Sequence, residues 1–310
     1  MTKITAELTK PLLIDGAMST ALEQLGADTN NSLWTASVLA NQPALVKKVH
    51  QEYFKAGARL AITDTYQANV PAFIKNGYSK QEAHSLIQRA VALAKEARDE
   101  YQQETGIYNY VAGALGPYGA YLANGSEYSG DYHLSTTEYQ QFYRPRLTDI
   151  LTVGVDVIAI ETQPRLDEVL AELDLVKELA PDTLCYVSFS LKDSTRLPDG
   201  TPLAVAARTV AKYPNVFAVG VNCIPLEEVT AAIETIHQAT DKPVIAYPNS
   251  SATYDPTTKT WSYPHGRRGL VDYLPRWLAA GLTIVGGCCT TTPQDIAALH
   301  EYLKGGAHHD

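Results

Sequence analysis

The chain has 310 residues, of which 45% are hydrophobic, and it carries a formal net charge of −9. This charge argues against a general binder of nucleic acid or of anionic membranes, because both are themselves negatively charged. A chain of this length buries roughly 75% of the surface that its unfolded form exposes, so it is long enough for a large apolar core.

The sequence also bounds where the protein works. Residues 1–10 lack the basic start and apolar stretch of a signal peptide, and no apolar run approaches the roughly 20 residues that span a bilayer. We therefore expect a cytoplasmic protein that does not enter a membrane. The chain holds four cysteines. In a reducing compartment we expect them to be reduced and to serve as metal ligands or catalytic groups.

Apolar runs typical of buried strands alternate along the chain with amphipathic stretches typical of helices. Near the amino terminus, one helix is expected to end at Gly26, and the next to begin at Pro43 and end at Gly57. The apolar runs are nearly continuous, as expected of parallel strands that are covered on both faces. The predicted strands cover residues 11–15, 60–63, 110–115, 155–162, 184–190, 216–223, 243–248 and 282–285.

Later helices have recognisable starts: Ser79 with Glu82, and Ser135 with Glu138, have the spacing of a capping box. Eight strand–helix units predict an α/β fold, a (β/α)8 TIM barrel. We expect one domain over residues 1–310, with about 304–310 as a disordered tail. A doubly wound open sheet is the alternative, but no Gly-x-Gly-x-x-Gly turn follows the first strand.

In such a barrel, chemistry takes place at the carboxyl ends of the strands. Two carboxylates, Asp15 and Glu161, lie there at the ends of apolar runs. They suit binding of a cation such as an α-amino group. A Gly- and Tyr-rich segment over residues 116–132 is long for a barrel connection, so we expect it to be functional.

Three cysteines follow two of the predicted strands. Cys223 ends the sixth, and the adjacent Cys288 and Cys289 come shortly after the eighth. Adjacent cysteines rarely bridge each other, because their backbone geometry opposes the dihedral of the bond. Three thiolates at strand ends form a soft site that selects Zn²⁺ and leaves one coordination position open. Cys185, inside the fifth strand, is expected to be a small buried apolar residue.

Motifs at the strand ends resemble those of the homocysteine S-methyltransferase family, nearer to its S-methylmethionine-dependent branch than to its betaine-dependent one. The likeness covers nearly the whole chain in the family's order, and the single-cysteine and double-cysteine motifs together are highly specific. The matching segments are Leu13–Ala17 with Thr20, Leu33-Trp34, Ala61–Thr63 with Tyr66–Ala68, Gly116–Gly119, Glu161-Thr162, Gly220–Cys223, Tyr247–Ser250 and Gly286–Cys289.

This resemblance implies a zinc ion held by Cys223, Cys288 and Cys289, with the sulfur of homocysteine as the incoming ligand. A free thiol with a pKa of about 8.5 is mostly protonated and a poor nucleophile at neutral pH, and coordination to a metal deprotonates it. The thiolate can then attack the methyl carbon of a sulfonium and give methionine. The implied substrates are homocysteine and S-methylmethionine, with S-adenosylmethionine as a second candidate donor.

The resemblance also implies contacts with the substrates. Asp15 and Glu161 would bind the amino group of the substrate, Gly16 would pack its backbone against it, and Thr63 and Asn222 would line the pocket. Aromatic faces suit the cation of the donor. The expected donor-binding rings are Trp34, Tyr66, Tyr118 and Tyr247, with Tyr121, Tyr128 and Tyr132 as further candidates from the 116–132 segment.

One segment departs from the family, because this chain has Ser251-Ala252 where the family commonly has Gly-Glu. Donor specificity therefore stays open. Two other classes of function also stay open. One is a thiol-based redox or sensor protein that uses Cys288 and Cys289, and the other is a non-catalytic binder of zinc or of a sulfur amino acid. The sequence marks no interface, so the oligomeric state is not predicted.

Overall fold

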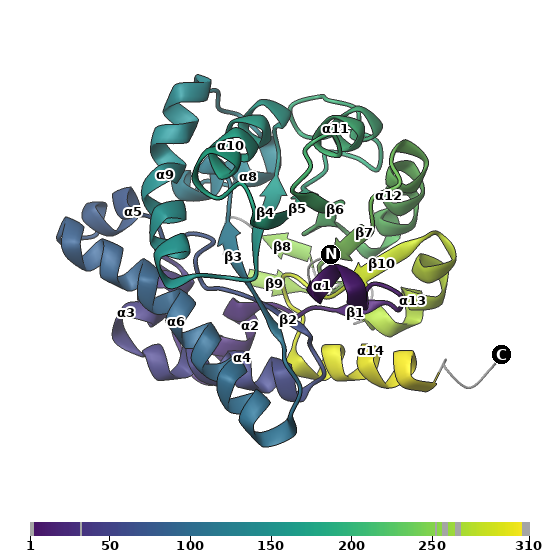
Figure 1. The fold of residues 1–310 in the computed structure, drawn as a ribbon, viewed down its shortest axis with the longest axis horizontal. Helices are drawn as coiled ribbons and strands as arrows, with labels where there is room; N and C mark the ends of the chain where they lie inside the picture. Colours follow the sequence, from purple (N-terminus) through teal and green to yellow (C-terminus); the bar gives the residue numbers. More distant parts are fainter. Residues whose placement is uncertain (1–2, 32, 252, 256–259, 264–267, 306–310) are drawn as a thin grey trace.

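Eight parallel strands form the centre of the molecule, as Figure 1 shows. The computed structural model describes residues 3–31, 33–251, 253–255, 260–263 and 268–305. Neighbouring strands follow the order β1-β10-β7-β6-β5-β4-β3-β2, and a parallel bridge between Ile14 and Leu60 closes the ring. The strands are β1 (Leu12–Leu13), β2 (Leu60–Ile62), β3 (Tyr110–Leu115), β4 (Val157–Gln163), β5 (Leu184–Phe189), β6 (Val216–Asn222), β7 (Val244–Tyr247) and β10 (Leu282–Val285).

The predicted single-domain (β/α)8 barrel is thereby confirmed, and the main helices surround the strands. Both predicted capping boxes are present, at the starts of α6 and α9. The helices are α2 (Met18–Gln24), α3 (Thr35–Asn41), α4 (Pro43–Lys55), α5 (Val70–Lys75), α6 (Lys80–Thr105), α9 (Thr136–Val153), α10 (Leu166–Leu179), α11 (Leu203–Val210), α12 (Leu226–Ala239), α13 (Leu270–Ala279) and α14 (Pro293–Gly305).

The carboxyl terminus differs from its prediction in part. Helix α14 continues to Gly305, so residues 304 and 305 are helical where a disordered tail was expected. The last turn of the helix includes Lys304, whose positive charge is favourable at the negative end of the helix dipole. The rest of the predicted tail, 306–310, lies outside the described residues.

Two apolar layers hold the barrel together. The outer layer packs the helices against the strands, and the inner layer fills the ring with side chains such as Leu60, Tyr186 and Ile284. Fully burying a large apolar side chain contributes roughly 1.5–3 kcal/mol, so these layers supply most of the stability. The short helix α1 (Lys3–Glu7), which the sequence did not predict, adds Ile4 to the inner layer.

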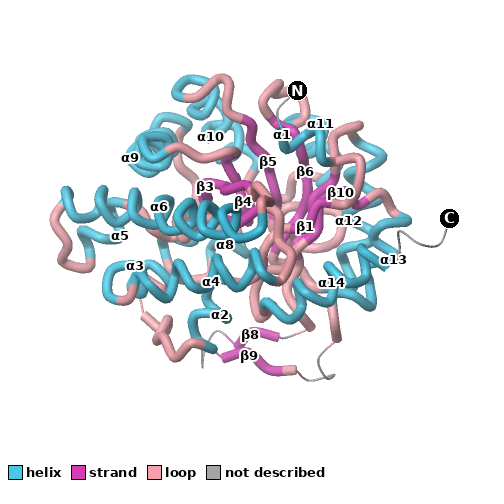
Figure 2. The backbone as a smooth tube through the Cα atoms, turned by 60° about the horizontal axis from the view of Figure 1, so that its bottom comes forward, coloured by secondary structure: helices cyan, strands magenta, loops and turns pink. Residues whose placement is uncertain are grey.

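The two ends of the barrel are covered differently. Figure 2 places α1 at one end and a small hairpin at the other. This hairpin, β8 (Thr253–Asp255) with β9 (Thr260–Ser262), follows β7 and was not predicted from the sequence. Because β7 delivers the chain to it, the hairpin lies on the side of the carboxyl ends of the strands.

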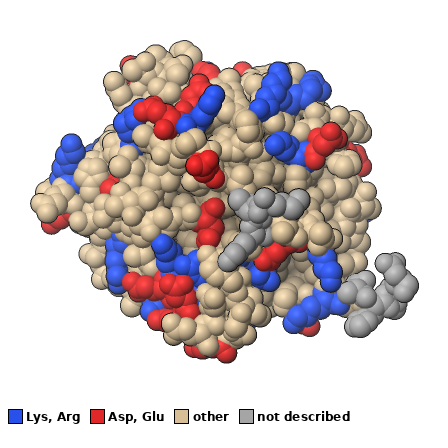
Figure 3. Space-filling model, viewed as in Figure 1, with Lys and Arg blue, Asp and Glu red and all other residues tan. Residues whose placement is uncertain are grey.

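The face shown in Figure 3 carries acidic and basic side chains in mixed groups over the surrounding helices. Exposed ion pairs among the described residues include Arg144 with Glu178 and Arg196 with Asp193. Exposed pairs of this kind contribute little to stability, because solvent screens the two charges. Among the described helices, none has the length and apolar character needed to cross a bilayer.

Candidate metal and substrate site

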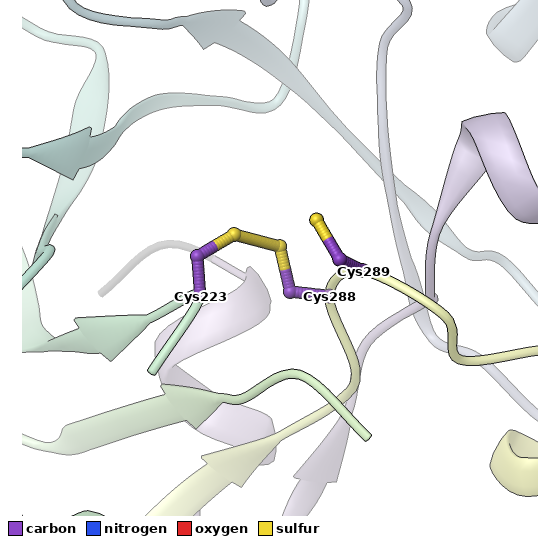
Figure 4. Close-up of side chains that lie close together, drawn as sticks. All are labelled: Cys223, Cys288 and Cys289. Carbon is purple, nitrogen blue, oxygen red and sulfur yellow. A yellow bond between two sulfur atoms is a disulfide. The ribbon is translucent and has the colours of Figure 1, made fainter. Parts of the chain in front are cut away.

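Three of the four cysteines meet at the carboxyl ends of β6 and β10. The sulfur atoms of Cys223, Cys288 and Cys289 all lie within 4.8 Å of one another. Figure 4 shows Cys223 and Cys288 joined as a disulfide, with the sulfur of Cys289 close by. The expectation of reduced cysteines is therefore wrong for this pair. The two chain segments bring the Cα atoms within 5.5 Å of each other, which is the normal separation for a disulfide.

The backbone at this site is unusual. Among the described residues, five that are not glycine have a positive φ, and three of them lie here: Thr162 at 58°, Cys223 at 53° and Thr290 at 63°. Such a conformation costs about 1–3 kcal/mol for each residue, and it persists where the surrounding structure enforces it. Cys223 is held by its N–H, which donates to the carbonyl oxygen of Tyr247 at 3.2 Å. Its turn out of β6 is thereby fixed.

Two glycines explain how the segment after β10 comes so close to β1. A Cβ atom on Gly286 would collide with the side chain of Ile14 and would lie 2.7 Å from the carbonyl oxygen of Asp15. A Cβ atom on Gly287 would collide with the side chain of Thr291. The N–H of Gly287 donates to the carbonyl oxygen of Asp15 at 3.0 Å. The glycine pair therefore places the two following cysteines beside the end of β1.

The chemistry of the sulfur cluster fits a bound soft cation. Burial raises the pKa of the Cys289 thiol to about 12, and a hydrogen bond from the side chain of Tyr128 acts in the opposite direction. A thiol in such surroundings stays neutral unless a nearby positive charge compensates. Three sulfurs that converge on one point are the donor set that zinc-type metals take. By contrast, Cys185 is fully buried within β5 and packs in the apolar layer, as predicted.

Two buried carboxylates lie at neighbouring places on the inner rim. Asp15 is 3% exposed; its Oδ2 accepts from the N–H of Ile62 at 2.8 Å, and its Oδ1 has no hydrogen-bond partner among the described residues. Glu161 is 6% exposed and accepts from the hydroxyl of Tyr247 at 3.0 Å. Burial raises the pKa of Glu161 to about 7. It also raises the pKa of Asp15, which the charge of Glu161 raises further. A cation between the two carboxylates would relieve both effects.

A chain of hydrogen bonds runs from Glu161 toward the sulfurs. The hydroxyl of Tyr247 also shares a hydrogen bond of 2.5 Å with Ser188, which donates to Oδ1 of Asn222 at 2.8 Å. The Nδ2 of Asn222 donates to Thr162 at 2.7 Å and lies 4.0 Å from the sulfur of Cys288. The predicted pocket residue Asn222 thus links four strand ends. Ser188 and Thr162 complete this network, a role that the sequence did not reveal.

Two other predicted contacts have structural partners of their own. The hydroxyl of Thr63 pairs with that of Thr65 at 2.7 Å and accepts from the N–H of Ala114 at 3.1 Å. A Cβ atom on Gly16 would lie 2.8 Å from Oγ1 of Thr291. Thr63 therefore ties β2 to β3, and Gly16 lets the first loop pack beside the segment that follows the cysteines.

The predicted donor-binding rings lie at three places. Trp34 and Tyr66 lie together, with ring centroids 6.3 Å apart, and the hydroxyl of Tyr66 is hydrogen-bonded to Thr162. Tyr247 lies at the carboxylates, where its hydroxyl donates to Glu161 and its ring contacts that of Tyr186. Tyr118 lies elsewhere, with its ring packed against Phe142 of α9 at 4.9 Å between centroids. Tyr121 and Tyr132 belong to this same aromatic cluster.

The segment over 116–132 was expected to be a functional loop, and it contains two short helices, α7 (Tyr118–Leu122) and α8 (Ser126–Ser129). Helix α8 brings Tyr128 into hydrogen-bond contact with the sulfur of Cys289. It also places Glu127 near the same sulfur. No sequence pattern singled out Glu127, because one glutamate in a polar loop is unremarkable. Ser251 and Ala252 stand where the family commonly has Gly-Glu. The hydroxyl of Ser251 accepts from the N–H of Arg268 at 2.7 Å, and Ala252 lies outside the described residues.

Comparisons with known proteins agree with this arrangement. The family model for homocysteine S-methyltransferase matches residues 12–303. The chain belongs to the homocysteine S-methyltransferase family. A homocysteine S-methyltransferase of Escherichia coli (strain K12) is 47% identical over 292 residues, which cover 93% of this chain and 94% of that protein. Homocysteine S-methyltransferase YbgG of Bacillus subtilis (strain 168) is 43% identical over 305 residues, 96% of each chain.

Solved structures of the homocysteine methyltransferase MmuM from Escherichia coli are similar over the whole barrel. Its metallated form has a TM-score of 0.87 at 43% identity and covers 97% of this chain and 99% of its own. Its oxidized form has a TM-score of 0.88 at 44% identity, and the match covers 96% of this chain and 99% of that chain. The predicted family and the predicted class of enzyme, a methyltransferase, are therefore confirmed.

Proposed function

We propose that this member of the family transfers a methyl group from a sulfonium donor to homocysteine, with zinc as its metal, and so forms methionine. One observation carries the proposal: three cysteine sulfurs converge at the ends of β6 and β10, near the buried carboxylates Asp15 and Glu161. One oxygen of Asp15 has no hydrogen-bond partner among the described residues and is free to accept from a cation. A thiol-binding metal site and an ammonium-binding site, side by side, match the two ends of homocysteine.

Cys223, Cys288 and Cys289 would hold the metal. Bound zinc would supply the positive charge that lowers the pKa of the homocysteine thiol toward neutral pH. Three protein ligands leave one position for the substrate sulfur, whereas a purely structural zinc normally takes four. Because Cys223 and Cys288 are joined in this structure, reduction of that bond must precede loading.

Asp15 and Glu161 would bind the ammonium group of homocysteine. Both are buried, so a salt bridge here is stronger than one at the surface. Tyr247 fixes Glu161 through its hydroxyl, and the network through Ser188 and Asn222 fixes Tyr247. The amino-acid end of homocysteine is thereby held at a set position relative to the sulfur cluster.

The transfer itself needs no general acid. When a sulfonium gives up its methyl group, the rest of the donor leaves as a neutral thioether. No proton therefore has to be supplied to the leaving group. The main task of the chain is to place the attacking sulfur and the methyl carbon in line at about 3–3.5 Å. Helix α8 lies against the sulfur cluster through Tyr128, whose side chain is in hydrogen-bond contact with the sulfur of Cys289.

The donor that we propose is S-methylmethionine, on the resemblance of the motifs, with S-adenosylmethionine as the competing donor. A single experiment tests metal and donor together. The protein is reduced and loaded with zinc, zinc per chain is measured, and methionine formation from homocysteine is followed with each donor. We expect one zinc per chain and turnover with S-methylmethionine.

The other outcomes separate the remaining alternatives. Zinc without turnover on either donor would favour a non-catalytic binder. Absence of both zinc and turnover in freshly reduced protein would overturn the proposal. Titration of thiols with and without a chelator tests the redox alternative, because the three thiols of a zinc enzyme should react only after the metal is removed.

A further inference from the structure

Glu127 presents a fixed carboxylate beside the sulfur cluster. The backbone nitrogen of Glu127 lies close to Gly119: a Cβ atom added to Gly119 would be only 2.6 Å from it. The carbonyl oxygen of Glu127 accepts a hydrogen bond from the hydroxyl of Ser190 at 2.9 Å. Contacts to α7 and to the end of β5 thus hold the backbone of α8 in place. The side chain is half-buried, and its Oε2 atom is shielded from solvent without a hydrogen-bond partner among the described residues.

The surroundings of this carboxylate contain rings and a sulfur. Glu127 lies close enough to Tyr66, Tyr128 and Cys289 to act electrostatically on all three. None of the ion pairs among the described residues includes Glu127, and its Oε2 atom has no hydrogen-bond partner there. A shielded carboxylate without a cationic partner is costly unless a ligand supplies the cation.

The proposed reaction has two amino-acid substrates, and therefore two ammonium groups to bind. Asp15 and Glu161 act on each other electrostatically, so they form one site on the inner rim. Glu127 comes from a different element, on the side of Cys289. Tyr66 is within electrostatic reach of both Glu127 and Glu161, so its ring lies near both groups of carboxylates.

The donor carries two cationic groups, a sulfonium and an ammonium, and the change of charge during the reaction indicates which of them Glu127 should bind. A sulfonium loses its positive charge as the methyl group leaves, so a carboxylate beside it would stabilise the ground state more than the transition state. The ammonium group keeps its charge throughout, and a carboxylate there binds both states equally. The faces of Tyr66 and Tyr128 suit the sulfonium, because rings attract a cation without forming a full ion pair.

We propose that Glu127 binds the α-ammonium group of the methyl donor and so selects donors that are amino acids. This inference rests on the proposed function. It adds a donor subsite on α8 to the homocysteine subsite on the strand ends.

The test compares S-methylmethionine with its analogue without the amino group, 4-(dimethylsulfonio)butyrate, in the zinc-loaded protein. We expect kcat/KM to be about 10- to 100-fold higher for S-methylmethionine, the range for a hydrogen bond to a charged group. In Glu127→Gln this preference should largely disappear, through a higher KM for S-methylmethionine, while the KM for homocysteine stays unchanged. Glu127→Asp keeps the charge and should retain part of the preference.

A matched control is Glu104→Gln, which changes an exposed glutamate near the end of α6 and should leave all constants unchanged. The inference is wrong if the wild-type protein does not distinguish the two donors, or if Glu127→Gln retains the full preference. It is also wrong if Glu127→Gln weakens both donors and homocysteine equally, since that points to a structural role. Failure of the wild-type protein to methylate homocysteine with either donor would instead overturn the proposed function.

Discussion

The two sides of the site are built from different kinds of structure. The proposed homocysteine side lies on the ends of β1, β4 and β7, where Asp15, Glu161 and Tyr247 are almost fully buried and a hydrogen bond joins Tyr247 to Glu161. The proposed donor side uses α8, a helix of four residues inside a long connection. Strand ends are rigid, whereas connections vary more easily. The comparison suggests that the acceptor is fixed by the barrel and the donor is chosen by the loop.

The largest expected effect comes from the sulfur cluster, on which both sides depend. Replacing Cys288 with Ala removes one of the three proposed ligands, so bound zinc should be lost and activity should fall by more than about 100-fold, the upper range for loss of a residue that only supports a ligand. Zinc content and methionine formation measure this. Cys185→Ser is the control and should keep the wild-type amount of zinc. A fully loaded, active Cys288→Ala would remove this cysteine from the site.

The second change separates the two sides. Glu161→Gln keeps the shape but removes the charge that we propose for the ammonium group of homocysteine. The KM for homocysteine should rise about 10- to 100-fold, as expected for loss of a charged hydrogen bond. Bound zinc and the KM for the donor should not change. Steady-state kinetics with each substrate varied in turn distinguish the sides, and an unchanged homocysteine KM would count against this role.

The third prediction concerns pH and follows from the pKa of Glu161, which burial raises from its ordinary 4.5 to about 7. Below that pH the free carboxyl is protonated and offers no charge, so the affinity for homocysteine should increase as the pH rises through about 7. Asp15 contributes in the same direction, because its pKa is also raised by burial and by Glu161. Binding measured across this pH range should lose much of its dependence in Glu161→Gln.

The same shift has a consequence for stability. A carboxyl with a raised pKa binds its proton more tightly in the folded protein, so its contribution to stability is present below its ordinary value and is lost as the pH rises through about 7. Homocysteine should offset this loss, because its ammonium group pairs with the charged form. Thermal unfolding with and without homocysteine should therefore differ more above this pH than below it.

The smallest effect is expected in the aromatic cluster away from the sulfurs. Tyr118→Phe keeps the ring packed against Phe142, so the donor KM should stay within about 2-fold of the wild-type value. This outcome would leave Tyr66 and Tyr128 as the aromatic residues expected to contact the donor. A rise in donor KM comparable to that of Glu127→Gln would show that the donor reaches farther along the loop.

Much of the barrel could be predicted because parallel strands buried on both faces have a strong pattern. The strand over Tyr110–Leu115 and the one over Leu282–Val285 have the predicted bounds, and Ser79 begins its helix as its capping box indicated. The hairpin after β7 was missed, because strands of three residues are too short for a periodic signal. Helix α8 was missed for the same reason.

The site shows a similar division. The cysteines and the two inner carboxylates could be singled out as candidates because each follows an apolar run, and such positions share one rim of a barrel. Glu127 had no such signal, since its place depends on how the connection folds over β4 and β5. The bond between Cys223 and Cys288 could not be predicted either, because it depends on the spatial approach of segments 65 residues apart. What strand ends carry can be predicted from the sequence, and what loops bring to them requires the structure.

The most direct test of the central proposal uses homocysteine labelled with deuterium on its carbon chain. A donor such as S-methylmethionine also becomes methionine when it loses its methyl group, so total methionine does not prove transfer. With reduced, zinc-loaded protein and unlabelled S-methylmethionine, we expect equal amounts of labelled and unlabelled methionine by mass spectrometry. Unlabelled methionine alone, or no methionine at all, would contradict methyl transfer to homocysteine from this donor.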